Sequence, residues 1–330
     1  MIFLNAHEVR SALPWVPLIE ALTEIFREGC TAPTRHHHDL TDGVGPGTLL
    51  IMPAWRDTLG LGVKLVTVFP DNRLRGLPAI AGLYVLFDPS RGNAVAALDG
   101  GELTARRTAA TSAMAAKFMA RRDAEVLTVV GTGRLCTNLI EAHSCVRRIS
   151  KVYVWGRDRD KANTVVRNLG DKRAIVADDL ETAVRQSDIV SSATLSTVPL
   201  VKGDWLRAGT HLDLVGAFKP YMRETDAAVW RKADVIVVDT HEGTRDEAGD
   251  ILLAEAEGVA VFDRVRGSLF ELARGQIVGR TDDRDITVFK SVGAAQEDIA
   301  AAHLAMRLSP KRVNAAATGA AIARDPVVAA

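Results

Sequence analysis

The sequence predicts an α/β protein: a doubly wound parallel sheet preceded by a separate α+β domain. From residue 125 onward, short apolar segments alternate with segments of helix length, which is typical of βαβ units. Before that, four strand-like segments follow one another with only turns between them, which predicts an antiparallel meander. We therefore expect one domain over residues 1–120, to which residues 305–330 return, and a second domain over residues 121–304.

Composition excludes several classes of partner. The 330 residues contain 41 Lys and Arg and 41 Asp and Glu, so no overall charge attracts nucleic acid or an anionic membrane. No apolar segment reaches the length of a membrane span. The three cysteines form no CxxC pair and suggest no disulfide framework. We expect a cytoplasmic protein that binds neither nucleic acid nor membrane.

The elements of the first domain follow from their apolar spacing. Apolar residues between Trp15 and Phe26 lie on one helical face, and Gly29 ends that helix. Turn residues separate the next segments, which we predict to be strands. A long helix over residues 102–122 then leads into the second domain. The predicted strands cover residues 48–55, 61–69, 81–87 and 94–100.

The second domain is expected to contain mostly parallel strands with helices on both faces. A late strand and helix follow within residues 286–306 and could pack back toward the first domain. The earlier strands are expected over residues 126–131, 151–156, 173–177, 188–194, 211–216 and 234–240.

A glycine turn opens this second domain. Gly131, Gly133 and Cys136 occupy the three small positions of a G-x-G-x-x-G/A pattern, between a predicted strand and a predicted helix. In a Rossmann-type domain the first glycine permits the sharp turn, the second admits a pyrophosphate, and the third small residue allows helix–strand contact. A structural turn without a nucleotide is the alternative. The context favours a dinucleotide site.

The end of the second parallel strand bears on which dinucleotide binds. An NAD site normally has an acidic residue there for the ribose 2′-hydroxyl. This sequence has Gly156 followed by Arg157, and a guanidinium can pair with a 2′-phosphate. NADPH is therefore favoured, with NADH possible. Arg157 and Arg159 could instead be solvated, and Asp158 or Asp160 could reach the ribose.

Several charged residues stand where apolar ones are expected. Lys64 lies in a predicted strand and shares its face with Val66 and Val68, a costly position for a cation without an anionic partner. The alternatives are an internal acidic partner or a lysine that snorkels from an edge strand. Arg106 and Arg107 fall in the first turn of the bridging helix, where the helix dipole disfavours cations.

Arg35 precedes three histidines on a possible edge strand. Strand alternation points His36 and His38 to one side and His37 to the other, so one metal ion cannot collect all three. We expect a polar pocket wall and no metal centre. Together with Lys64 and Arg107, Arg35 could hold a small carboxylate.

Seven ordered motifs across nearly the whole chain resemble the ornithine cyclodeaminase/μ-crystallin family. They include GVKLVTVFP, LTARRTAATSAMAA, VVGTGRLC, DLVGAFKPYMRETD and TVFKSVGAAQEDIAAA, with LLIMPAW and VWGRDRDKA. The resemblance implies an N-terminal substrate and dimerisation domain, a Rossmann domain and a homodimer. It implies that Lys64 and Arg107 hold the substrate carboxylate as the catalytic pair, joined by Arg35. We also expect substrate contacts at His36, His38 and Met52. The implied cofactor contacts are Thr108, Gly131, Thr132, Gly133, Arg134, Leu135, Gly156, Arg157, Ala193, Thr194, Val215, Gly216, Ser291 and Gly293.

One position departs from the cyclodeaminase pattern. Cyclodeaminases carry a Gly-Asp-x-Pro motif whose Asp assists deamination, and here Phe218 stands at that position. A phenyl ring cannot accept a proton, which argues against cyclodeaminase activity. The DLVGAFxPxMRETD form, together with RHHHDL, resembles the bacterial ketimine reductase branch. That branch uses NADPH to reduce Δ1-pyrroline-2-carboxylate, and often Δ1-piperideine-2-carboxylate, to L-proline and L-pipecolate.

The proton source for such a reduction is open, with His36, His38 or water as candidates. Two alternatives to the reductase stay open as well. One is a cyclodeaminase or an alanine dehydrogenase-like enzyme that uses NAD. The other is a μ-crystallin-type protein that binds NADPH and a small ligand without turnover.

Overall fold

The computed structural model describes residues 1–40 and 47–311 and contains the two expected kinds of sheet. Its contacts divide the chain into two compact units, which are described separately. The first unit comprises residues 1–21, 29–107 and the chain from 295; the second comprises residues 22–28 and 108–294. The units divide within one continuous helix, α3 (Gly100–Met119), whereas the sequence analysis placed the boundary at residue 120. Most of the predicted returning segment, residues 312–330, lies outside the described residues.

The first unit contains a mixed sheet in the order β1-β6-β5-β4-β3-β2. The predicted antiparallel meander is present as β3 to β6, and the histidines lie on β2, an edge strand as expected. At the opposite edge, β1 pairs parallel with β6. β1 has three residues and is too short to show alternation. The strands are β1 (Ile2–Leu4), β2 (His36–Leu40), β3 (Gly47–Arg56), β4 (Gly60–Val68), β5 (Ile80–Phe87) and β6 (Ala94–Asp99).

The two faces of this sheet differ in burial. Leu50, Met52 and Lys64 alternate with partly exposed neighbours and are themselves buried. Helix α11 (Ala295–Leu308) packs on β3, β4 and β5, and an ion pair with Lys64 places it on this buried face. The opposite face carries apolar side chains that stay partly exposed, including Trp55 and Leu83. The unit also contains α1 (Ala6–Ala12), the first half of α2 (Trp15–Glu28) and η1 (Pro70–Arg75).

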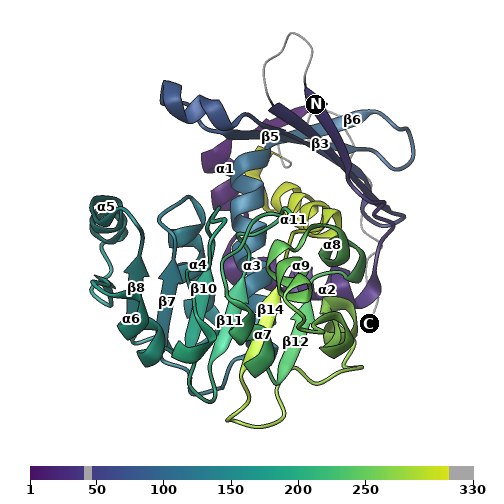
Figure 1. The fold of residues 1–330 in the computed structure, drawn as a ribbon. Coiled ribbons are helices and arrows are strands. Elements are labelled where there is room, and N and C mark those ends of the chain that lie inside the picture. Colours follow the sequence, from purple (N-terminus) through teal and green to yellow (C-terminus); the bar gives the residue numbers. More distant parts are fainter. Residues whose placement is uncertain (41–46, 312–330) are drawn as a thin grey trace. The chain divides into compact units, whose positions relative to one another are not determined.

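The second unit contains a sheet whose eight described strands are all parallel, in the order β13-β12-β14-β11-β10-β7-β8-β9, with helices on both faces (Figure 1). Strand order reverses between β7 and β10, which is where α/β sheets bind ligands at their carboxyl ends. The strands are β7 (Val126–Val130), β8 (Lys151–Trp155), β9 (Ala174–Val176), β10 (Ile189–Ser192), β11 (His211–Leu214), β12 (Val235–Val238), β13 (Val265–Ser268) and β14 (Thr287–Lys290).

Burial explains why these strands could be predicted from the sequence. Val190, Leu212 and Val288 are fully buried on neighbouring strands, and Trp230 packs in the same cluster. A sheet covered on both faces requires apolar residues without alternation. The helices of the unit are α4 (Leu135–Val146), α5 (Arg159–Leu169), α6 (Leu180–Gln186), η2 (Gly203–Trp205), α7 (Ala227–Lys232), α8 (His241–Glu247), α9 (Gly249–Ala256), η3 (Phe262–Arg264) and α10 (Leu269–Ala273).

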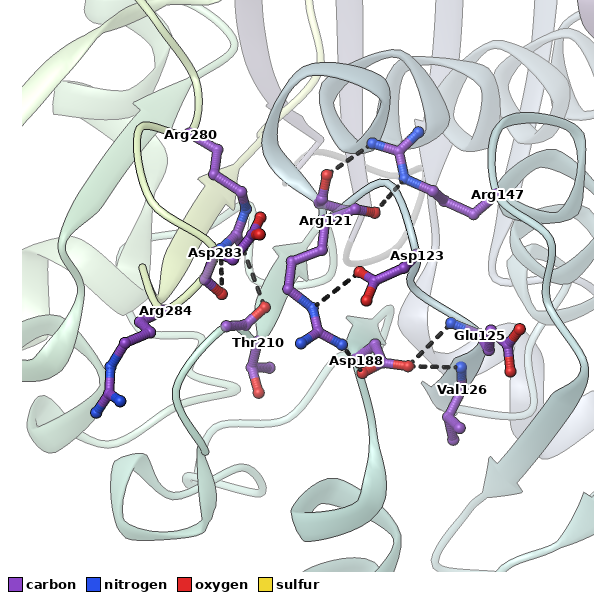
Figure 2. A network of polar contacts seen from close by, with 12 residues as sticks. Arg121, Asp123, Glu125, Val126, Arg147, Asp188, Thr210, Arg280, Asp283 and Arg284 are labelled. Carbon is purple, nitrogen blue, oxygen red and sulfur yellow. Dashed lines mark hydrogen bonds and ion pairs between the residues drawn. The ribbon is translucent and has the colours of Figure 1, made fainter.

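A polar network occupies the amino end of this sheet (Figure 2). Asp188 accepts hydrogen bonds from the backbone N–H groups of Glu125 and Val126 and pairs with Arg121 at 2.7 Å. Arg147 donates to the carbonyl of Arg121 (Figure 2). It also donates to the carbonyls of Ala116 and Lys117 in the last turn of α3 and to that of Ala120 just after it. The network satisfies the end of that helix, whose last carbonyl groups have no intrahelical partner. Since Val126 begins β7, the network lies at the opposite end of the sheet from the glycine turn.

Candidate functional site

Four buried charged side chains form one cluster in the first unit. Lys64 Nζ lies 2.7 Å from Asp298 Oδ2, and the other oxygen of Asp298 accepts from Arg107 Nε at 3.0 Å. Arg107 Nη1 lies 2.6 Å from Glu297 Oε2. Both carboxylates come from the first turn of α11, Lys64 from β4 and Arg107 from α3. Lys64 therefore has the internal acidic partner that the sequence left open as one alternative.

Burial shifts the titration of both cations. It lowers the pKa of Lys64 to about 8, with Arg107 adding to the decrease and Asp298 opposing it. Burial also acts to lower the pKa of Arg107, but the charges of Asp298 and Glu297 outweigh it and raise that pKa. Arg107 is thus a permanent cation, whereas Lys64 changes its charge within an experimentally accessible range.

The sheet register places further side chains beside Lys64. Met52 and Tyr84 are its direct neighbours on β3 and β5, and both are buried on the same face. The Tyr84 ring extends over Gly62, where an added Cβ would lie 2.0 Å from the hydroxyl oxygen. A glycine is therefore required at that position. Within the described part of the chain, the Tyr84 hydroxyl has no hydrogen-bond partner. Burial raises its pKa well above the ordinary value.

The side chains of His36 and His38 do not lie where the sequence analysis predicted them. The rings of His36 and His38 do lie on one side of β2, with centroids 6.3 Å apart. However, His37 pairs with Leu50, whose face is that of Lys64, so His36 and His38 point to the other face. The prediction that these two side chains join Lys64 is therefore not supported in this sheet. Arg35 is two residues before His37, so alternation along the chain puts it on the same side as His37, which is the side of Lys64. The charge of Arg35 helps to lower the pKa of Lys64.

Arg106 and Arg107 have different surroundings. They lie in the second turn of α3, not the first, because the helix begins two residues earlier than predicted. The Arg106 guanidinium stacks 3.4 Å from the centroid of the Trp15 ring and donates to the Leu13 carbonyl. These contacts explain Arg106 as a packing residue. Arg107 contacts the two carboxylates.

The predicted glycine turn joins β7 to α4 in the second unit. Gly131 has φ 121°, and a Cβ there would lie 2.7 Å from the carbonyl oxygen of Ala193. Both facts require glycine, and the contact places the turn beside the end of β10. A Cβ on Gly133 would meet nothing within 4 Å, so the backbone is open to approach. Cys136 is buried, as expected for the small third position. This cradle fits the pyrophosphate of a dinucleotide.

The end of β8 lies beside this turn. The Gly131 N–H donates to the Trp155 carbonyl, and a Cβ on Gly156 would lie 2.6 Å from Thr132 Cγ2. A side chain at residue 156 would therefore have to displace Thr132. Arg134 and Arg157 are exposed on either side of this contact.

The acidic alternatives at this strand end have other contacts. Asp158 caps α5 by accepting from the N–H groups of Asp160 and Lys161. Arg159 pairs with Asp178 on the surface. Among the residues that the structure describes, Arg157 has no ion-pair partner.

The other predicted cofactor contacts lie mostly at the carboxyl ends of the strands. Asp239 Oδ2 accepts from the Ser291 hydroxyl and from the N–H groups of Val292 and Gly293, which fixes the segment after β14. The remaining positions are Ala193 and Thr194 after β10, Val215 and Gly216 after β11, Leu135 at the start of α4, and Thr108 within α3.

Phe218 follows β11 and packs, partly buried, against the core of the second unit. It presents no titratable group where the cyclodeaminase motif has a carboxylate. Within residues 1–40 and 47–311, no group of three or more His, Cys, Asp or Glu side chains could hold a metal ion. Among the described helices, none has the length and apolar composition of a membrane span.

Comparisons with known proteins show similarity over most of the chain. A model of the ornithine cyclodeaminase/mu-crystallin family matches residues 2–307. A Δ1-pyrroline-2-carboxylate reductase of Paracoccus denitrificans is 38% identical over 300 residues, which cover 90% of this chain and 93% of the relative.

Two solved structures extend the comparison. The Thermococcus litoralis Δ1-pyrroline-2-carboxylate reductase, in complex with NADH and L-proline, has a TM-score of 0.88 at 32% identity and covers 95% of this chain and 98% of its own. An archaeal alanine dehydrogenase dimer with bound NAD has a TM-score of 0.87 at 30% identity and covers 95% of this chain and 97% of its own.

Proposed function

This chain belongs to the ornithine cyclodeaminase/mu-crystallin family, and from that premise we propose that it reduces cyclic ketimine carboxylates with NADPH. The proposed substrate is Δ1-pyrroline-2-carboxylate, with Δ1-piperideine-2-carboxylate as a second one, and the products are L-proline and L-pipecolate. The family comprises NAD(P)-dependent oxidoreductases that include imine reductases and amino-acid dehydrogenases. We choose a small carboxylate as the substrate because two cationic side chains, Lys64 and Arg107, are buried in one cluster.

The substrate carboxylate is proposed to bind Lys64 and Arg107, assisted by Arg35. Arg107 offers a planar, permanently charged donor group, and Lys64 a point charge. Asp298 contacts both cations and thereby holds them at a defined separation before the substrate arrives. Fixing the carboxylate orients the ring carbon C2, and such orientation contributes a large part of many rate accelerations.

Bound NADPH supplies a hydride from its nicotinamide C4 to C2 of the imine. The imine nitrogen takes up one proton from solvent, so one NADPH and one proton are consumed for each amino acid formed. Phe218 supports reduction over deamination, because it cannot act as the acid or base that deamination of ornithine requires.

The preference for NADPH rests on the surface around the end of β8. Gly156 leaves no acidic group there, Asp158 is engaged as a helix cap, and Arg134 and Arg157 are exposed. A guanidinium that pairs with a 2′-phosphate favours NADPH over NADH. The two related structures described above contain NADH or NAD. The preference for NADPH is therefore proposed from the residues of this chain and is not taken from those relatives.

We propose a homodimer through the sheet of the first unit. Trp55 and Leu83 lie on the face of this sheet opposite Lys64 and are 41% and 37% exposed. An apolar sheet face of this kind is typical of a subunit interface. The archaeal alanine dehydrogenase of similar fold is a dimer.

Steady-state oxidation of NADPH and NADH tests the proposal, with each of the two imines and with ornithine plus NAD as a comparison. The account predicts turnover of at least one imine with NADPH, and a lower kcat/KM with NADH. Arg157→Ala should lower kcat/KM for NADPH about tenfold and leave the value for NADH unchanged. Ammonia release from ornithine without imine turnover would identify a cyclodeaminase. Tight NADPH binding with no turnover of either imine would identify a binding protein.

A further inference from the structure

One buried carboxylate joins the ends of two neighbouring strands in the second unit. Glu224 lies between β11 and α7 and is fully buried. Its Oε1 accepts from the Ser192 hydroxyl at 2.7 Å, from Thr194 N at 2.7 Å and from Thr194 Oγ1 at 2.8 Å. Its Oε2 accepts from Gly216 N at 2.7 Å. The segments after β10 and β11 therefore share one anchor.

Both oxygens of Glu224 must act as acceptors. The N–H groups of Thr194 and Gly216 can only donate, and they contact different oxygens of the carboxylate. A glutamine has one carbonyl oxygen and one NH₂ group, so in either orientation one of these N–H groups loses its acceptor. A Cβ at Gly216 would lie 2.1 Å from the Thr194 carbonyl and 2.5 Å from Glu224 Oε1, so only glycine fits at residue 216.

The backbone of Glu224 is itself fixed from a third strand. Asp250 Oδ1 accepts from the N–H groups of Glu224 and Thr225, and its Oδ2 lies 3.0 Å from Lys290 Nζ. Lys290 ends β14 and is fully buried, as is Asp250. The network thus connects the carboxyl ends of β10, β11 and β14.

We propose that Glu224 is a positioning residue for the nicotinamide half of the dinucleotide. The inference rests on the proposed function, since it takes the second unit to bind NADPH. In doubly wound sheets the adenosine half lies on the side of the first βαβ unit, here β7 and β8, and the second half lies across the switch point, here β10 and β11. By fixing Thr194 and Gly216, Glu224 prepares the second half of the site, and its carboxylate accepts hydrogen bonds from the segments at the ends of β10 and β11.

Binding of two nucleotides to Glu224→Gln tests this assignment. NADPH contains both halves, whereas 2′,5′-ADP contains only the adenosine half and its 2′-phosphate. We expect the variant to bind NADPH about tenfold more weakly, which corresponds to one lost buried hydrogen bond, and to bind 2′,5′-ADP as the native protein does. Glu271→Gln is the matched control, because Glu271 accepts from Ser268 N at the start of α10. It should bind both nucleotides as the native protein does.

The outcomes separate this inference from the proposed function. If the native protein binds neither nucleotide, the proposed function fails. If the native protein binds both, and Glu224→Gln weakens both equally or neither, the inference is overturned while the proposed function stands. If Glu224→Gln does not fold, Ser192→Ala takes its place, since it removes one of the four donors with a small change in volume. The same selective loss for NADPH, smaller in size, is then expected, and equal effects on both nucleotides overturn the inference.

Discussion

The charge of Lys64 should control how tightly a carboxylate ligand binds. Its pKa of about 8 arises from burial and from Arg107, opposed by Asp298. With this pKa, the protonated fraction falls from about nine tenths at pH 7 to about one tenth at pH 9. Arg107 keeps its charge over this range. If a carboxylate binds only when both cations are charged, its affinity should fall about tenfold between these pH values.

Pyrrole-2-carboxylate is a suitable probe, because it carries the carboxylate but no imine nitrogen that titrates in this range. Its inhibition constant should be measured against the imine at saturating NADPH, in native protein and in Lys64→Arg. An arginine stays protonated throughout, so the variant should show a flat profile. An inhibition constant that is independent of pH in the native protein would refute the assigned role of Lys64. A rise of equal size in both proteins would show that another group titrates.

Three further predictions concern stability. Asp298→Asn leaves Lys64 and Arg107 buried without the carboxylate that they share, so the free energy of unfolding in urea should fall by about 3–5 kcal/mol. Asp178→Asn at an exposed pair should change it by less than about 1 kcal/mol. Tyr84→Phe removes a buried hydroxyl that has no partner among the described residues, so the free energy of unfolding should stay unchanged or rise by about 1 kcal/mol. Tyr153→Phe is the control: it loses a hydrogen bond to Gln186, so the free energy of unfolding should fall by about 1 kcal/mol. A large loss in Tyr84→Phe would reveal a partner for that hydroxyl. Burial lowers the pKa of His211 to about 3, so folding favours the neutral imidazole. The resulting contribution to stability is complete above the ordinary pKa of 6.5 and is lost as the pH falls from 6.5 toward 3. The decline of Tm with acid should be shallower in His211→Asn, and equal slopes in both proteins would contradict the assignment.

Much of the fold follows from patterns that are local in the sequence. Alternation in β3, β4 and β5 and uninterrupted apolar segments in the parallel sheet are visible without any tertiary information. Two strands were missed for the same reason. β1 has three residues and β13 reads VRGS, so neither shows a period, and each is a strand only because a neighbour pairs with it.

Only some residues of the candidate site could be predicted from local patterns in the sequence. Lys64 stands out in the sequence because a cation among valines conflicts with its surroundings. Glu297 and Asp298 do not, because acidic residues in the first turn of a helix are ordinary. Only the packing of α11 on the first sheet brings them to Lys64 and Arg107, across 190 residues of sequence in the case of Glu297.

Parity explains the remaining error at the histidines. The sequence shows that His36 and His38 share a side, but not which face of the sheet that side is. The register with β3 decides it, and a shift by one residue would exchange the two faces. Glu224 was missed for a similar reason, since its four donors come from two other segments of the chain, at the end of β10 and after β11.

Transfer of a deuterium label tests the central claim most directly. The protein is incubated with Δ1-pyrroline-2-carboxylate and NADPH that carries deuterium at the transferable C4 position, and the product is analysed by mass spectrometry and proton NMR. The account predicts L-proline with one deuterium on its α-carbon. Unlabelled proline, or no proline while NADPH stays bound, would contradict it.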